Sequence, residues 1–308
     1  MPNLGSRRRR NLLGCSDCLC HDGPMDNQWV PFGMSNEEAS EYAVLVDGVP
    51  GRLRNSLLSW IMDNIGFDQG LANTGICLDI QLHTAIDLGA EAGSLTPAED
   101  VIGLLNTLNG LELLRIADFQ LSNFGASPYA SGLVQSLDRM LAAASSRWKV
   151  GTRAGNSGLE ERVPEGVQDA VEGVIAESGS AGRMLARAWA HVHGFQPDAS
   201  AGYAMAVRAV EIAAQPVVEP KNKSATLGTM IAVMRQNGDW RLPLREHDHA
   251  PGPEMLVNNL RTLWHGHRDR HGTADYSDVT LDEARAAVGL CAVLVDWFSA
   301  GLIERKSV

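Results

Sequence analysis

Hydrophobic residues recur every three to four positions over most of the chain from residue 35 onward. This is the period of a helix that buries one face and leaves the other to solvent. Within residues 53–65 one face collects Leu53, Leu57, Trp60, Ile61 and Ile65. The pattern predicts a mostly α-helical fold.

The last long pattern, residues 280–301, begins with Thr280 and Glu283 at the spacing of a capping box, in which each residue satisfies an N–H group at the helix start. Its apolar stripe comprises Leu281, Ala284, Val288, Cys291, Val295 and Phe298. Thr96, Pro97 and Glu99 likewise predict a helix start, with Thr96 as the N-cap residue.

Residues 146–153 are the one stretch in which polar and apolar residues alternate as in a strand, and a glycine-containing turn follows them. We expect at most a short β-hairpin here, and it sets the predicted domain boundary. The expected organisation is a disordered tail over residues 1–34, an acidic N-terminal helical domain over 35–150, connecting helices over 151–200, and a four-helix bundle over 201–302.

The net charge and its distribution along the chain limit how the protein can bind nucleic acid. The 308-residue chain has a formal net charge of −11. Residues 201–308 hold 12 lysines and arginines against 13 aspartates and glutamates, whereas the first 200 residues hold 14 against 24. A protein that coats nucleic acid by bulk electrostatics is basic, so any RNA contact here must be made locally by a few arginines.

No apolar run reaches the roughly 18 residues of a membrane-spanning helix, and no apolar stretch of signal-peptide length follows the basic start of the chain. These features predict a cytoplasmic protein without a membrane partner. Cys15, Cys18, Cys20 and His21 are potential zinc ligands. Adjacent Cys20 and His21 cannot easily reach one ion together, so we favour a tail and predict no metal or other cofactor.

Residues 263–273, LWHGHRDRHGT, hold three of the nine histidines and two arginines. The pattern of residues 254–270 predicts a helix whose buried stripe is Leu256, Leu260 and Leu263. Continuing this stripe leads to His267 and His271, near the helix end. Arg268 and Arg261 share a neighbouring face, so two imidazoles and two guanidiniums are expected at one edge of the bundle.

Three interpretations compete for this cluster. Cations at a helix C-terminus are favoured by the helix dipole, and Gly272 is a suitable left-handed residue after it. His267 and His271 have the spacing of zinc ligands, but the glutamate of the usual motif is absent and the arginines repel a dication. Alternatively, a histidine base and guanidiniums suit attack of an RNA 2′-hydroxyl on its phosphodiester without a metal ion.

A family resemblance bears on the choice among these three interpretations. It is carried by four segments: AVRAVEIAA (206–214) with Glu211, ATLGTMI (225–231), HRDRHG (267–272) and LDEARAAVGLCAVLVDWF (281–298). Together they resemble the abortive-infection C-terminal domains of bacterial phage-defence proteins, in the HEPN superfamily. The resemblance covers about residues 195–302. It implies a small helical bundle, often dimeric, with an arginine–polar–x–histidine motif late in a helix.

The superfamily motif usually has four to six residues between arginine and histidine. Two residues separate Arg268 from His271, and five separate Arg261 from His267. We favour Arg268 with His271 and keep Arg261 with His267 as the alternative pair. Glu211 either orients the catalytic arginine or lies exposed beside Arg208.

The sequence thus predicts a metal-independent endoribonuclease effector of the abortive-infection type, without a cofactor. Its catalytic residues would be His271 and Arg268, with His267, Arg261 and Glu211 as further candidates. RNA bound at a local site and a second copy of the chain are the expected partners. The alternative is a non-enzymatic helical interaction or regulatory protein, in which RDRHG is a capped helix end.

Overall fold

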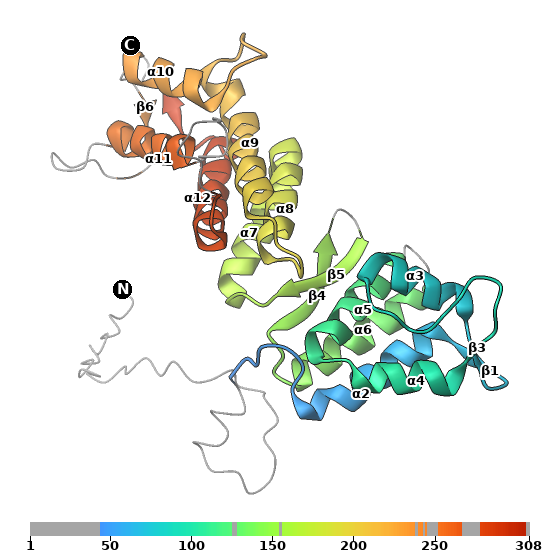
Figure 1. The fold of residues 1–308 in the computed structure, drawn as a ribbon. Coiled ribbons are helices and arrows are strands. Elements are labelled where there is room, and N and C mark those ends of the chain that lie inside the picture. Colours follow the sequence, from blue (N-terminus) through green and yellow to red (C-terminus); the bar gives the residue numbers. More distant parts are fainter. Residues whose placement is uncertain are drawn as a thin grey trace, which may run out of the picture. The chain divides into compact units, whose positions relative to one another are not determined.

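A computed structural model describes residues 44–124, 128–153, 156–237, 240–242, 244, 252–266 and 278–305. The described residues from Leu45 onward belong to one compact unit. They contain eleven helices and only short antiparallel strands, which confirms the predicted mostly α-helical fold (Figure 1). Within this part of the chain, no helix is both long and apolar enough to cross a membrane.

The N-terminal elements surround one hydrophobic core. In chain order they are α2 (Gly51–Ile65), β1 (Phe67–Asp68), β2 (Leu71–Ala72), α3 (Thr74–Thr84), β3 (Thr96–Pro97), α4 (Ala98–Thr107), α5 (Gly110–Asn123) and α6 (Pro128–Ala143). The predicted stripe of α2 is buried throughout, so its face was predicted correctly. The Trp60 indole lies in this core and donates a hydrogen bond from Nε1 to the Leu133 carbonyl oxygen at 3.1 Å.

The predicted N-cap at Thr96 is wrong. Thr96 belongs to β3, which extends the antiparallel β1–β2 pair into a three-stranded sheet, and it lies opposite Ala72. Helix α4 begins only at Ala98, with Pro97 in the N-cap position. A residue before proline favours extended backbone, and this preference fits Thr96 as a strand residue.

The hairpin predicted near residues 146–153 is present and longer than expected. Strand β4 (Trp148–Arg153) pairs with β5 (Asn156–Glu161), so that Lys149 lies opposite Glu160 and Gly151 opposite Gly158. Two further small sheets, β1–β2–β3 and the β6–β7 pair, were not predicted. Their strands have only two residues each, too few for an alternating pattern to appear in the sequence.

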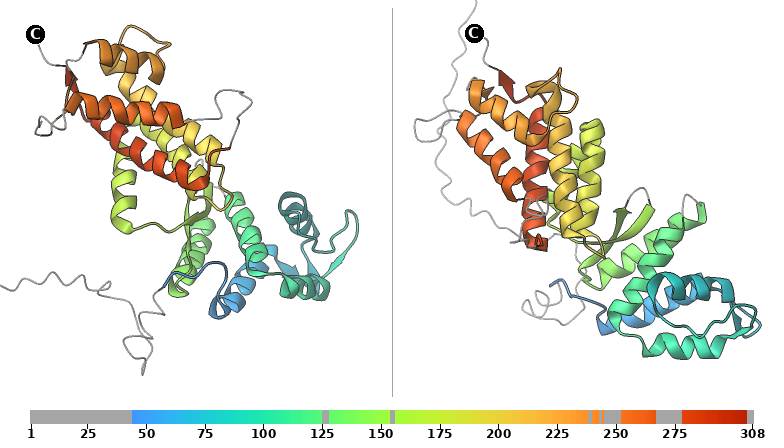
Figure 2. Two further views of the ribbon diagram at one scale, coloured as in Figure 1. Left: turned by 60° about the vertical axis from the view of Figure 1, so that its left-hand side comes forward. Right: turned by 45° about the horizontal axis from the view of Figure 1, so that its top comes forward.

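The C-terminal elements surround a second core. They are α7 (Glu165–Glu177), α8 (Gly179–His193), α9 (Ala199–Val218), α10 (Leu227–Asn237), β6 (Trp240–Arg241), α11 (Gly252–Gly266), α12 (Leu281–Ser299) and β7 (Glu304–Arg305). Helices α8, α9 and α12 pack against one another (Figures 1 and 2).

Helices α7 and α8 contribute Val171 and Leu185 to the same core as α9–α12. Residues 151–200, predicted as connecting helices, therefore also contribute side chains to the C-terminal core. The sequence pattern showed that each helix has an apolar face, but it did not show against which core that face packs. The predicted stripe of α12 is buried apart from half-buried Leu281, and its Thr280–Glu283 capping box is confirmed.

Candidate functional site

The described part of α11 confirms the predicted buried stripe but not the catalytic geometry. Leu256, Leu260 and Leu263 are buried in the C-terminal core. His267, Arg268 and His271 lie outside the described residues. The structure therefore bears on the candidate cluster only through the helix that leads into it.

The last described turn of α11 is fixed against two other helices. The Tyr203 hydroxyl of α9 donates a hydrogen bond to the Leu263 carbonyl oxygen at 3.0 Å. A Cβ atom at Gly266 would overlap this hydroxyl, and one at Gly228 of α10 would overlap the Trp264 ring. Glycine at these two positions leaves room for the Tyr203 hydroxyl and the Trp264 ring, so α11 packs closely on α9 and α10 just before the histidine- and arginine-rich segment.

Arg261 lies on the outer side of α11, beside a hollow of 320 Å³ that α10 and α11 line together. Arg235 of α10 lines the same hollow, and both arginines are exposed. Neither forms an ion pair with a described residue. Glu254 and Asn258 also line the hollow, so its described lining holds two guanidiniums and one carboxylate.

Glu211 has a role that neither prediction described. It is half-buried on α9, and its Oε1 accepts a hydrogen bond from the Leu227 backbone N–H at 2.7 Å. Leu227 is the first residue of α10, so the carboxylate satisfies one of the free N–H groups at a helix start, where negative charge is also favoured. The structure does not bring Glu211 and Arg261 together in any described contact.

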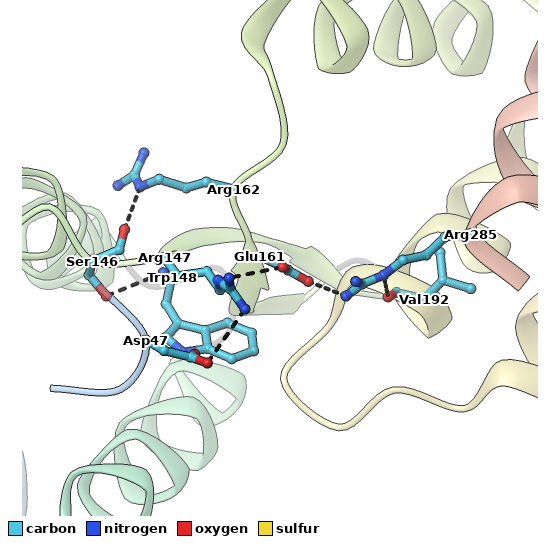
Figure 3. Close-up of polar contacts among 8 residues, drawn as sticks. All are labelled: Asp47, Ser146, Arg147, Trp148, Glu161, Arg162, Val192 and Arg285. Carbon is cyan, nitrogen blue, oxygen red and sulfur yellow. Dashed lines mark hydrogen bonds and ion pairs between the residues drawn. The ribbon is translucent and has the colours of Figure 1, made fainter. Parts of the chain in front are cut away.

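A chain of charged side chains joins the β4–β5 hairpin to α12 (Figure 3). The Glu161 carboxylate lies between Arg147, with 3.7 Å from Nε to Oε1, and Arg285 of α12, to which it is also hydrogen-bonded. Arg285 donates from Nε to the Val192 carbonyl oxygen at 3.2 Å, and Arg147 reaches Asp47 at 3.5 Å. The network therefore connects residues far apart in sequence around one partly buried carboxylate.

The hairpin also forms one wall of a cavity of 780 Å³, whose other walls come from α7 and α8. At this wall Lys149 Nζ lies 3.0 Å from Glu160 Oε1, and both side chains are largely buried. A Cβ atom at Gly151 would overlap the Glu160 carboxyl group, so the Glu160 side chain occupies space that only a glycine at position 151 leaves open. Arg183, Arg187 and Trp189 of α8 line the opposite side.

His193 lies next to this cavity, with its ring tilted by 40° to that of Trp189 at a centroid distance of 4.1 Å. It is 8% exposed, and its Nδ1 is buried without a hydrogen-bond partner among the described residues. Burial, with the nearby charges of Arg285 and Lys149, lowers the pKa of His193 to about 4. The imidazole is therefore neutral at pH 7.

Among the described residues, no three histidine, cysteine, aspartate or glutamate side chains gather as metal ligands would. The cysteines and histidine of residues 15–21, considered as zinc ligands, lie outside the described residues. Cys77 and Cys291 are both core residues, as the apolar stripe of residues 280–301 predicted for Cys291, and burial raises the pKa of both thiols. They have the environment of inert structural cysteines.

The cavity residues are further candidates, and their sequence pattern alone does not single them out. Arg183 and Arg187 lie one helical turn apart in RMLARAW (183–189), with Trp189 nearby, so this part of the pattern is visible in the sequence. Lys149 and Glu160 are a cross-strand pair, and their approach to α8 depends on the tertiary fold.

Comparison of the chain with models of known protein families, with curated proteins and with solved structures found no match. The resemblance to abortive-infection domains therefore stays a prediction.

Proposed function

We propose that the protein is a metal-independent endoribonuclease effector of the abortive-infection type. The supporting observation is the arrangement of α11. This helix buries Leu260 and Leu263, and leaves the Arg261 guanidinium exposed without an ion pair to a described residue. A cation that has no ion pair within the described part of an acidic chain is available for a phosphate group.

The anchoring of α11 gives this proposal a second support. Catalysis requires groups held in one geometry, and sites on rigid helices achieve this better than sites on loops. The bond from Tyr203 to the Leu263 carbonyl fixes the helix directly before the cluster. The hollow with Arg235 and Arg261 provides a local cationic surface of the kind that RNA binding by an acidic protein needs.

In the proposed reaction a neutral histidine, His271 or His267, takes the proton of an RNA 2′-hydroxyl. The 2′-oxygen then attacks the adjacent phosphorus, and the bond to the 5′-oxygen of the next nucleotide breaks. That oxygen takes up a proton, so the products are a 2′,3′-cyclic phosphate and a 5′-hydroxyl end. Arg268 or Arg261 stabilises the charge that develops on the phosphoryl oxygens. A second copy of the chain would place two such motifs across a shared cleft.

The test is cleavage of a mixed RNA panel by the full chain in EDTA. We expect cyclic phosphate ends, and no cutting of RNA whose 2′-hydroxyls are methylated. Loss of the general base lowers such a rate by about 10²–10⁴-fold. His271→Ala compared with His267→Ala, and Arg268→Gln compared with Arg261→Gln, identify which pair acts. Arg208→Gln, on the exposed side of α9, is the matched control and keeps full activity.

Cutting of the methylated RNA, or cutting that all four variants retain, would contradict the proposed mechanism. Intact RNA after incubation with folded wild-type protein would favour the alternative, a non-enzymatic helical interaction protein. Under that alternative, RDRHG serves only to end the helix.

A further inference from the structure

The cavity between the β4–β5 hairpin, α7 and α8 has the dimensions and lining of a small-molecule site. Its volume of 780 Å³ lies within the range of about 300–1,000 Å³ that is common for ligand pockets. Its walls combine apolar side chains such as Val171 and Ile175 with a few charged groups. This combination is typical of a site that both encloses and orients a ligand.

One wall is suited to a phosphate group. Arg183 and Arg187 lie one turn apart on α8, both are exposed, and neither forms an ion pair with a described residue. Residues at this spacing have Cβ atoms about 5–6 Å apart on the same helix face. Two guanidiniums so placed can bind one phosphate from two sides, with paired N–H donors from each.

An aromatic ring lies beside these arginines. Trp189 lines the cavity while its ring packs on that of His193. The His193 imidazole is buried, so it supports the indole from within the protein. An indole held in one orientation is a stacking surface for a planar heterocycle such as a nucleobase.

The cavity also has acceptors for hydroxyl groups. Glu160 uses Oε1 to pair with Lys149, and Glu172 uses Oε1 to accept from Gln168 Nε2 at 2.6 Å. The second carboxylate oxygen of each has no hydrogen bond to a described residue. Carboxylates that line a nucleotide site accept hydrogen bonds from ribose hydroxyls. The lining thus combines cations for the phosphate, an aromatic ring for the base and carboxylates for the sugar hydroxyls of a ribonucleotide.

We propose that this cavity binds a ribonucleotide, with its phosphate on Arg183 and Arg187, its base on Trp189, and its sugar hydroxyls on Glu160 and Glu172. The site is independent of the proposed catalytic cluster after α11. It therefore adds a small-molecule ligand to a protein whose proposed function concerns RNA.

The test is isothermal titration calorimetry of the full chain with AMP, GMP, CMP and UMP, each to millimolar concentration. At least one should bind more tightly than inorganic phosphate and more tightly than the corresponding nucleoside. Arg183→Gln with Arg187→Gln should weaken nucleotide binding by about tenfold or more, because charged hydrogen bonds to the phosphate are lost. Arg208→Gln is the matched control and should leave it unchanged.

Trp189→Leu separates the two parts of the ligand. It should weaken binding of the nucleotide by about fivefold or more and leave binding of inorganic phosphate unchanged. Absence of binding by all four nucleotides to the folded wild type would overturn the proposal. So would nucleotide binding that the double arginine variant retains. Equal affinity for phosphate and nucleotide would reduce the site to an anion site and refute the roles of Trp189 and the carboxylates.

Discussion

The two hydrophobic cores differ in the number of polar side chains buried in and around them. Eight polar or charged residues are buried in the described part of the chain, and only His193 of these lies in the C-terminal helices. The N-terminal elements are linked by irregular backbone, which side chains must satisfy: Gln81 Oε1 accepts from the N–H groups of Leu88 and Ala90, at 3.1 and 2.8 Å. Long helices satisfy most of their own backbone groups. The N-terminal core thus depends on buried hydrogen bonds, and the C-terminal core on close helix packing.

The largest effect should come from removing a buried acceptor in the N-terminal core. Asp118 is 5% exposed, and its Oδ1 accepts from the Leu159 N–H at 2.7 Å. Asp118→Ala should lower the free energy of unfolding by about 3 kcal/mol, because it removes a charged hydrogen bond and leaves a buried N–H unpaired. Urea denaturation measures the change, and Asp63→Ala, at an exposed position of α2, should change it by less than about 0.5 kcal/mol.

Close packing should dominate in the C-terminal core. A Cβ atom at Gly182 of α8 would overlap the Ile175 carbonyl group of α7, whereas at Gly173 of α7 it would meet nothing. Gly182→Ala should therefore destabilise the protein by about 2 kcal/mol through overpacking. Gly173→Ala should instead stabilise it by up to about 1 kcal/mol, because alanine favours the helix. Thermal or urea unfolding should show changes in stability of opposite sign for the two variants. Changes of the same sign would disprove the close approach of Gly182 to the Ile175 carbonyl group.

His193, the one buried polar residue among the described C-terminal helices, should make stability depend on pH. The pKa of His193 is about 4 in the folded protein, below the usual value of about 6.5 in an unfolded chain. Below pH 6.5 the unfolded state binds a proton that the folded state does not, so stability falls as pH drops from about 6.5 to about 4. The loss between pH 7 and 5.5 should be about 1 kcal/mol.

His193→Gln is the variant that isolates this contribution, because other titrating groups cancel when it is compared with the wild type. The difference between their free energies of unfolding should change across that pH range. A difference that is constant from pH 7 to 5.5 would show that His193 takes up its proton normally in the folded state.

The smallest effect should come from the ion pair that joins the hairpin to α12. A double-mutant cycle of Glu161→Gln and Arg285→Gln should give a coupling energy of roughly 0.5–1 kcal/mol, since the pair is only partly buried. The coupling should shrink in 1 M salt. A coupling energy of zero would mean that the Arg285 bond to the Val192 carbonyl alone holds this contact.

The sequence predicts well those features that depend on periodicity. The buried faces of residues 53–65, 256–263 and 284–298 follow from helical spacing alone, and the alternation after residue 146 was enough to predict the hairpin. A pattern of this kind belongs to one element, so it says which face is buried. It does not say which other element covers that face, so the prediction of connecting helices over residues 151–200 did not include the packing of α7 and α8 against the C-terminal core.

The candidate sites show the same limit. The cluster at 263–273 is conspicuous because its residues are contiguous, yet most of it lies outside the described residues. The cavity is built from four elements, and its Lys149–Glu160 pair depends on a strand register and on the space left by Gly151. Likewise, the role of Glu211 as a cap depends on where α10 begins. Such relations arise only from the tertiary fold.

The hairpin restricts how this protein can be divided into fragments. Leu159 has its side chain in the N-terminal core, and its carbonyl oxygen accepts from the Phe195 N–H at 3.0 Å. The Glu160 backbone forms an isolated antiparallel β-bridge with Gly194, and the Glu161 side chain forms an ion pair with Arg285. A fragment that begins after Pro164 would expose all three contacts on its new surface. The C-terminal helices should therefore be expressed, or exchanged between proteins, together with residues 148–161. This hairpin contacts both the N-terminal core and the C-terminal helices.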